Sequence, residues 1–249
     1  MAKTSIVFLG SKPVGYQCLE HLLAEATNLN VAVTGVLTKA RTEFGGAHDL
    51  SQLADDHAIP VFSHPDEMPS CDILLSVQYH RILTPPQLGK AQRLAVNLHM
   101  APLPEYRGSN QFTYAILEEK EEFGTTLHVM DSRIDHGPIL AQRRWKIPAD
   151  SWVEDLYTRT VEESVLLFKE ALPTLIAGHL KPLPQEELVG KYGTSLHLRK
   201  EMDALKIVDL SWPADKLERY LRATYMPGFE PPYALIGGRK VHLVPEALA

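Results

Sequence analysis

The sequence predicts an α/β fold, in which a mostly parallel sheet has helices on both faces and a small C-terminal helix and β-hairpin form an appendage. Three observations predict it. Short apolar segments alternate with helical patterns through the first half, as in parallel sheets whose strands are buried on both faces. The length of 249 residues suits one domain of about 200 residues plus a short extension. A hydrophobic content of 45% is enough to form a core.

The first half supplies the parallel strands. Each expected strand is a short apolar run, and these runs cover residues 5–9, 31–37, 60–62, 72–77 and 94–98. A helix should follow the first strand, since Pro13 is tolerated in a first helical turn, and another is expected over residues 48–58 after the polar segment 38–47. Ligands bind outside the carboxyl ends of such strands. The segments to search for a site are therefore 10–14, 78–83 and 97–108.

The second half continues the sheet and adds the appendage. A helix is expected over residues 110–117, a strand over 125–130, its partner over 139–147, and a long amphipathic helix from 151 to just before Gly178. After Pro182 and Pro184 the composition turns polar, with one helix over residues 214–225 and a hairpin around Gly237 and Gly238. We therefore divide the chain into a main α/β domain, residues 1–180, and a small C-terminal subdomain, residues 181–249.

Composition excludes several function classes. With 25 Lys and Arg against 31 Asp and Glu, the net charge of -6 argues against nucleic acid as a partner. Cys18 and Cys71 are too few for a disulfide framework and are expected to be small buried side chains. Neither they nor His128 and His136 have metal-ligand spacing, so no metal is expected. No run approaches the roughly 18 apolar residues that span a bilayer. We expect a cytoplasmic protein without a membrane segment.

An amide and an imidazole stand where the strand over residues 94–98 ends. Asn97 and His99 should point to the same side, because side chains alternate along a strand. Pro102 and Pro104 then stiffen a loop that cannot continue the sheet. These residues either face one site or simply cap a turn.

A carboxylate follows the next strand, in the segment DSRIDHG over residues 131–137. Asp135 could be directed inward, although Asp and Gly also favour ordinary turns. Together with Asn97 and His99 it supplies an oxyanion donor, a titratable base and an orienting carboxylate, a set that suits acyl transfer. No Ser or Cys nucleophile with an elbow motif is present in the sequence. Direct attack by the acceptor is therefore expected, without an acyl-enzyme.

The segments NLHMAPLPEYRG, GTTLHVMD and RIDHG followed by PIL resemble the formyltransferase superfamily that uses N10-formyltetrahydrofolate. Its members act on methionyl-tRNA, glycinamide ribonucleotide and nucleotide-linked amino sugars. The resemblance covers roughly residues 4–180 and implies a Rossmann-like catalytic domain. It implies that Asn97 and protonated His99 stabilise the tetrahedral oxyanion. His99 and Asp135 would move the proton from the attacking amine to the leaving nitrogen through water.

The resemblance also implies the ligand contacts. The residues expected to bind the folate, in two loops around the pterin, are Gln78, Tyr79, His80, Arg81, Ile82, Leu83, Met130, Asp131 and Ile134. The residues expected to bind the acceptor are Met100, Pro102, Arg107, Gly108 and Asn110. Apolar Ile82 and Leu83 suit a flat heterocycle. For Tyr79, His80, Arg107 and Asn110, an ordinary surface position is the alternative.

The acceptor depends on the C-terminal part. NLHMAPLPEYRGSNQF and the tail RATYMPGFEPPY are similar to the nucleotide-sugar N-formyltransferases, which formylate dTDP- or GDP-linked amino-deoxy sugars. This resemblance implies a role in surface polysaccharide synthesis, such as lipopolysaccharide O-antigen, and a homodimer formed through the hairpin region. Methionyl-tRNA formyltransferases carry a further C-terminal barrel, for which the residues after Gly178 leave little room. Formylation of another amine such as methionyl-tRNA, and a non-catalytic folate- or nucleotide-binding module, are the alternatives.

Overall fold

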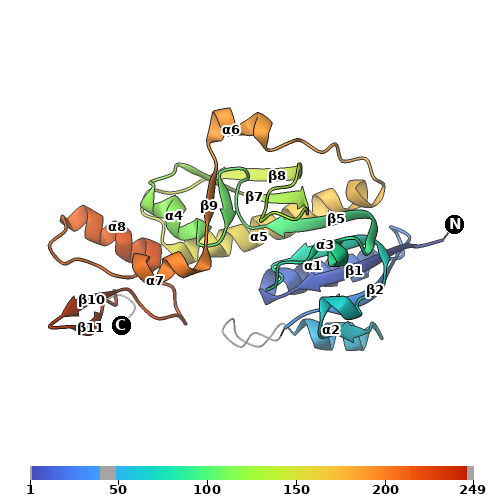
Figure 1. Cartoon of the computed structure of the whole chain (residues 1–249), viewed down its shortest axis with the longest axis horizontal. Coiled ribbons are helices and arrows are strands. Elements are labelled where there is room, and N and C mark those ends of the chain that lie inside the picture. Colours follow the sequence, from blue (N-terminus) through green and yellow to red (C-terminus); the bar gives the residue numbers. More distant parts are fainter. Residues whose placement is uncertain (1, 40–48, 246–249) are drawn as a thin grey trace.

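The computed structural model describes residues 2–39 and 49–245, and it confirms the α/β fold (Figure 1). The strands are β1 (Thr4–Gly10), β2 (Val31–Leu37), β3 (Val61–Phe62), β4 (Cys71–Val77), β5 (Ala91–His99), β6 (Tyr106–Gly108), β7 (Glu122–Val129), β8 (Ile139–Lys146), β9 (Ser195–His197), β10 (Tyr233–Ile236) and β11 (Arg239–His242). The helices are α1 (Lys12–Glu25), α2 (Leu50–Asp56), η2 (Pro65–Glu67), α3 (Pro85–Leu88), α4 (Gln111–Leu117), α5 (Val153–Ile176), α6 (Glu186–Tyr192), η3 (Arg199–Glu201), α7 (Met202–Leu205) and α8 (Ala214–Thr224). Most of the expected segment 38–47, and the start of the expected helix at His48, lie outside the described residues.

The central sheet has the order β3-β2-β1-β4-β5-β7-β8. The first five strands in this order run parallel, whereas β7 is antiparallel to both β5 and β8. After β1 the chain adds β2 and β3 on one side of β1, and it then crosses to β4 on the other side of β1. The direction in which strands are added therefore reverses between β1 and β4. Their carboxyl ends therefore border the crevice in which open α/β sheets bind ligands.

Two apolar cores lie on the two faces of the sheet. Along β1, Ile6 and Phe8 pack toward α1, α2 and α5, whereas Val7 and Leu9 pack in the cluster that contains Met68 and also Leu88 of α3. This alternation explains why the parallel strands are apolar throughout, because both of their faces are buried. Cys18 and Cys71 are buried as predicted.

A third apolar cluster joins the C-terminal part to the catalytic part. Ala223 of α8 is buried against side chains of α4 and of the start of α5, including Ala115 and Leu156. Figure 1 shows α7, α8 and the β10–β11 hairpin beyond the end of the sheet that carries α4. The proposed division near residue 180 therefore separates two parts that share a packed contact.

The sequence prediction missed several short elements. Residues between the expected helices form α6, β9 and α7, and β9 pairs in parallel with β6 in a two-stranded sheet. Elements of three to seven residues are too short to show a clear period in the sequence. The partner of β9 lies about ninety residues earlier, so local patterns could not reveal the pairing.

Candidate active site

A cleft of about 1050 Å³ opens at the carboxyl ends of β1, β4 and β5. It is lined by the three residues predicted to be catalytic, Asn97, His99 and Asp135. All residues predicted to bind the folate also line it, namely Gln78, Tyr79, His80, Arg81, Ile82, Leu83, Met130, Asp131 and Ile134. The sheet thus brings together segments separated by more than fifty residues of sequence.

Asn97, His99, His128 and Asp135 form one polar cluster, which we call the Asp135 cluster. Strand β5 places Asn97 directly opposite His128 of β7, and His99 opposite Thr126. The Asn97 amide nitrogen lies 3.2 Å from His128 Nε2 and donates to Asp135 Oδ1 at 3.3 Å. The alternation argument is therefore confirmed, since both residues face the same carboxylate.

His99 is held from two sides. Its Nε2 lies 2.7 Å from the Tyr106 carbonyl oxygen, and a carbonyl can only accept, so Nε2 carries a proton and donates it. Its Nδ1 lies 3.5 Å from Asp135 Oδ2. Only 4% of His99 is exposed, and it lines the cleft. Nδ1 is therefore the nitrogen that is available to a reacting group while the hydrogen bond from Nε2 to the Tyr106 carbonyl oxygen stays intact.

Asp135 has a left-handed backbone, with φ of 45°, in the turn between β7 and β8. Its Oδ2 accepts the Gly108 backbone N–H at 3.0 Å, and its Oδ1 lies 3.4 Å from His128 Nε2. Burial acts to raise the pKa of Asp135. The charge of His99 and the contacts with His128 and Gly108 outweigh burial, and they hold the pKa well below its usual value. The carboxylate therefore remains ionised at neutral pH.

His128 is the member of the Asp135 cluster that the sequence prediction missed. Its spacing in the sequence excludes a metal ligand but does not point to a place beside Asp135. Its Nδ1 donates to the Val129 carbonyl oxygen at 2.9 Å, which fixes the ring with Nε2 toward Asp135 and Asn97. The sequence contains a signal for this role of His128. The strand GTTLHVMD pairs antiparallel with residues 94–99, and this pairing puts His128 beside Asn97. Across residues 2–39 and 49–245, no group of three His, Cys, Asp or Glu side chains is arranged to hold a metal ion.

The loop predicted to bind the pterin follows β4 directly. Gln78 takes a left-handed backbone with φ of 55°, its carbonyl accepts the Ser11 hydroxyl, and its side-chain oxygen accepts from Lys12 Nζ at 3.2 Å. Ile82 is 72% exposed at the cleft, whereas Leu83 is buried beneath it. An exposed apolar side chain within a cleft suits contact with a flat heterocycle.

The other side of the cleft, here called the C-terminal wall, comes from the C-terminal part that the sequence resemblance links to the acceptor, although none of its residues is among the predicted site residues. Its members are His197, Leu198, Arg199, Lys200, Met202, Asp203, Lys206, Ala223, Thr224, Met226 and Phe229. Asn110 Nδ2 donates to the Leu198 carbonyl oxygen at 2.8 Å, and Ser109 N–H donates to the His197 carbonyl oxygen at 2.9 Å. These bonds attach the wall to the loop that carries Gly108. The sequence shows Arg199, Lys200 and Lys206 among the cations after Gly178, but it does not show that they face the cleft.

The predicted acceptor contacts divide into two groups. Gly108 and Asn110 line the cleft, whereas Met100, Pro102 and Arg107 are not among the residues that line it. Met100 is 1% exposed in the core, and Pro102 is buried against β7 close to Gly124. The Arg107 side chain turns away, with Nε donating to the Ser195 carbonyl oxygen at 3.3 Å. Burial and a backbone partner occupy these three side chains in this structure, and their contact with the acceptor stays a prediction.

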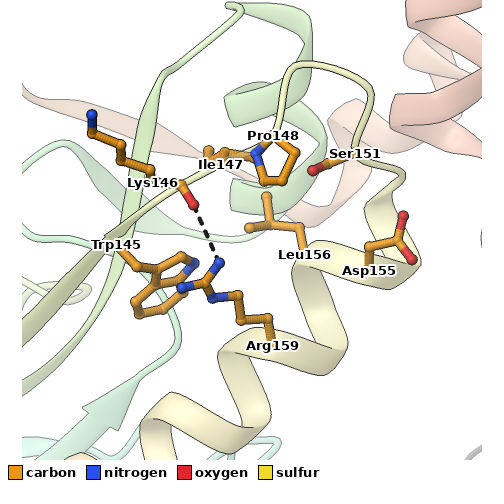
Figure 2. Close-up of a pocket in the computed structure, with 8 residues that line it drawn as sticks. All are labelled: Trp145, Lys146, Ile147, Pro148, Ser151, Asp155, Leu156 and Arg159. Atoms are coloured by element: carbon orange, nitrogen blue, oxygen red, sulfur yellow. Dashed lines mark hydrogen bonds between the residues drawn. The ribbon is translucent and has the colours of Figure 1, made fainter.

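A second, far smaller pocket of about 110 Å³ lies between the end of β8 and the start of α5 (Figure 2). Trp145 forms its floor, and Arg159 Nη1 donates across it to the Lys146 carbonyl oxygen at 3.4 Å. None of the predicted site residues lines it. Its volume is below the range of about 300–1,000 Å³ typical of small-molecule sites.

Three comparisons place this geometry among known proteins. Residues 60–172, which include the whole Asp135 cluster, match the family described as formyl transferase. The chain is 30% identical to a methionyl-tRNA formyltransferase of Myxococcus xanthus over 97% of this chain and 79% of that protein. It is 28% identical to a GDP-perosamine N-formyltransferase of Brucella melitensis, over 70% of this chain and 64% of that protein.

Solved structures share the fold over nearly the whole chain. An N-formyltransferase from Helicobacter canadensis, solved with folinic acid and dTDP-3-aminofucose, has a TM-score of 0.77 at 22% identity and covers 97% of this chain and 86% of its own. A sugar N-formyltransferase from a Shewanella species has a TM-score of 0.78 at 17% identity and covers 96% of both chains. The similarity includes the segments that form the C-terminal wall.

Proposed function

Because this chain belongs to the formyl transferase family, and is thus a formyl-transferring enzyme, we propose that it transfers the formyl group of N10-formyltetrahydrofolate to the primary amine of a nucleotide-linked amino-deoxy sugar, with dTDP or GDP as the nucleotide. The observation that carries the proposal is that one cleft contains the Asp135 cluster, a loop with an exposed apolar side chain, and the cationic C-terminal wall. The loop from Gln78 to Leu83 would hold the folate, and the C-terminal wall would hold the acceptor.

Charge on the C-terminal wall supports a diphosphate-containing acceptor. Arg199, Lys200 and Lys206 face the cleft, with Asp203 as the opposing charge on the same segment. Guanidinium and ammonium groups bind phosphate oxygens through charge-assisted hydrogen bonds. The cleft is also lined by cations from other segments, namely Lys12, Arg81 and Arg133. Of the cleft segments that the structure describes, only the C-terminal wall contributes three cations from one short segment, which suits a diphosphate group.

The Asp135 cluster supplies the groups that the transfer needs. The acceptor amine attacks the formyl carbon, so that a new C–N bond forms and the carbonyl oxygen becomes an oxyanion. We expect the Asn97 amide and His99 Nδ1 to donate to this oxyanion after turning from Asp135. His99, protonated at both nitrogens, then gives its Nδ1 proton to N10 of the folate and is reprotonated by the amine proton, which arrives through water. The oxyanion collapses to the carbonyl of the new formamide as the C–N10 bond breaks. Asp135 is a weak base with its lowered pKa, so it would orient His99 and stabilise positive charge rather than hold the proton.

Methionyl-tRNA is the second candidate acceptor, because relatives that act on it reach 30% identity over most of the chain. Against it stand the net charge of -6 and the small number of cations on the C-terminal wall, since attraction to tRNA grows with the number of phosphates neutralised. In the described part after α5, the chain folds into short helices, β9 and one hairpin. These observations rank the nucleotide-linked sugar first.

Assembly and location follow as further parts of the proposal. Leu235, Ile236 and Val241 on the β10–β11 hairpin are exposed apolar side chains, which supports a homodimer formed through the hairpin. Among the described residues, no helix is both long and apolar enough to cross a membrane. We propose a cytoplasmic enzyme that supplies formylated sugars for a surface polysaccharide such as O-antigen.

The test is direct. The purified protein is incubated with N10-formyltetrahydrofolate and a panel of dTDP- and GDP-linked amino sugars, beside methionyl-tRNA. Tetrahydrofolate release is followed by absorbance, and the formylated acceptor is identified by mass spectrometry. Turnover with a nucleotide-linked sugar is the expected result. Turnover with methionyl-tRNA alone would reverse the ranking of acceptors, and folate binding without any turnover would favour a binding module.

A further inference from the structure

Gln185, at the start of α6, lies beneath the turn that carries Asp135. Its side chain is buried, with 3% of the residue exposed. Its amide nitrogen donates to the Asp135 carbonyl oxygen at 2.9 Å and to the Gly137 carbonyl oxygen at 2.8 Å. An amide has two N–H donors, so both are used on this one turn. Gln185 is separated from Asp135 by fifty residues and belongs to none of the predicted motifs.

The turn needs such support from outside. The left-handed backbone of Asp135 is uncommon for a residue with a side chain and persists only when surrounding contacts fix it. The carbonyl groups of Asp135 and Gly137 lie outside the strands, and a carbonyl left unpaired on burial costs about 1–3 kcal/mol. At Gly137 the turn presses on β7, since an added Cβ would lie 2.0 Å from the Val129 carbonyl oxygen.

The segment before α6 is itself anchored to the sheet. Leu183 and Ile139 exchange both backbone hydrogen bonds at 2.8 Å, directly after the turn re-enters β8. A further contact joins the same two segments, because His136 Nδ1 lies 2.9 Å from Asp131 Oδ2 and its Nε2 lies 3.3 Å from Glu186 Oε1. The turn is therefore held between β7 and the start of α6.

We infer that Gln185 is a positioning residue for formyl transfer, which fixes the backbone of Asp135 so that its carboxylate stays between His99 and His128. The inference rests on the proposed function, because it assumes that Asp135 takes part in the reaction. Gln185 would not touch either substrate, since it is not among the residues lining the cleft. Gln185 would affect the reaction rate only by fixing the turn that carries Asp135.

A double-mutant cycle tests the inference. Gln185→Leu removes both donors, and displacement of a catalytic group by about 1 Å can cost on the order of 10² in rate, so we expect kcat to fall by about that factor. Asp135→Asn is expected to lower kcat as well. If Gln185 acts through Asp135, adding Gln185→Leu to Asp135→Asn should cost little further rate. A general structural role would instead multiply the two losses, and that outcome would overturn the inference.

The nearly isosteric variant Gln185→Glu covers the case in which Gln185→Leu fails to fold. An ionised carboxylate cannot donate to two carbonyl oxygens, whereas its protonated form can donate to one. The ratio of variant to unsubstituted kcat should therefore rise as the pH is lowered. A ratio that stays constant with pH would contradict the inference.

Glu187→Gln provides the matched control on the exposed side of α6 and should leave kcat unchanged. Thermal unfolding of every variant reports whether the fold is retained. If the unsubstituted enzyme transfers no formyl group to any acceptor, the proposed function fails. If it does, but Gln185→Leu is as active as the unsubstituted enzyme, only the inference about Gln185 fails.

Discussion

The two sides of the cleft are built differently. The Asp135 cluster is formed by side chains of β5 and β7 and of the turn that follows β7, and its two histidines are buried and held by backbone carbonyl groups. The C-terminal wall presents exposed cations, such as Arg199 and Lys200, from short elements joined to the body by hydrogen bonds and by the apolar cluster around Ala223. The difference suggests a division of labour, in which the sheet sets the geometry of the transfer and the wall sets the affinity for the acceptor. Substitutions on the two sides should then affect different kinetic constants.

The largest effect is expected within the Asp135 cluster. Asn97→Ala or His99→Ala removes a donor to the oxyanion, which typically costs about 10²–10³ in rate. The loss should appear in kcat, with much less change in the KM of the acceptor, because the interaction is made mainly in the transition state. Steady-state kinetics with N10-formyltetrahydrofolate and the best acceptor of the panel measure both constants. Unchanged kcat in both variants would refute the assignment of this cluster.

A smaller and different effect is expected on the C-terminal wall. Arg199→Ser or Lys200→Ser should raise the KM of a diphosphate-linked acceptor by about tenfold or more, since hydrogen bonds to charged groups contribute about 1.5–3 kcal/mol. The kcat at saturation should change little, and the defect should grow less pronounced as salt screens the charge. Lys181→Ser serves as control, because Lys181 is exposed and does not line the cleft. Equal effects at Lys181 would indicate only a general role of net charge.

The low pKa of Asp135 predicts how stability depends on pH. Burial opposes ionisation, but the charge of His99 and the contacts of His128 and Gly108 lower the pKa in the folded state. A carboxyl group whose pKa is lowered on folding stabilises the protein above its unfolded pKa of about 3.9. That contribution is lost as the pH falls through the folded pKa.

Thermal unfolding followed by circular dichroism over the acid range measures this dependence. The unfolding temperature should fall more steeply toward acid in the unsubstituted protein than in Asp135→Asn. Parallel curves for the two proteins would mean that Asp135 does not gain its stabilisation from ionisation. Variants of the C-terminal wall, which leave the Asp135 cluster intact, should keep the steeper curve.

The same contrast explains what the sequence could predict. Strand alternation, which is a local rule, predicts that Asn97 and His99 face the same side, and the structure shows this. The parallel order of β1, β4 and β5 puts Gln78 to Leu83 at the same end of the sheet. Met100 lies in the core because the buried segment continues past the end of β5, and position after a strand does not separate core side chains from cleft side chains. The C-terminal wall and Gln185 depend on contacts across fifty to ninety residues, which no local pattern encodes.

The smallest effect of a substitution is expected at the second pocket, which unlike the cleft contains none of the predicted site residues. Arg159 reaches across it to the Lys146 carbonyl oxygen at 3.4 Å, lies 5.7 Å from the Trp145 ring centre, and is 3.9 Å from Glu163 one turn along α5. Each contact is long and partly exposed, and exposed pairs of this kind contribute about 0.2–1 kcal/mol. Arg159→Ala should therefore lower the free energy of unfolding by about 1 kcal/mol or less and leave kcat and both KM values unchanged. Denaturant unfolding and steady-state kinetics check the two statements. A clear loss of turnover in this variant would mean that the pocket is coupled to the reaction, and the cleft could then no longer be treated as the whole functional site.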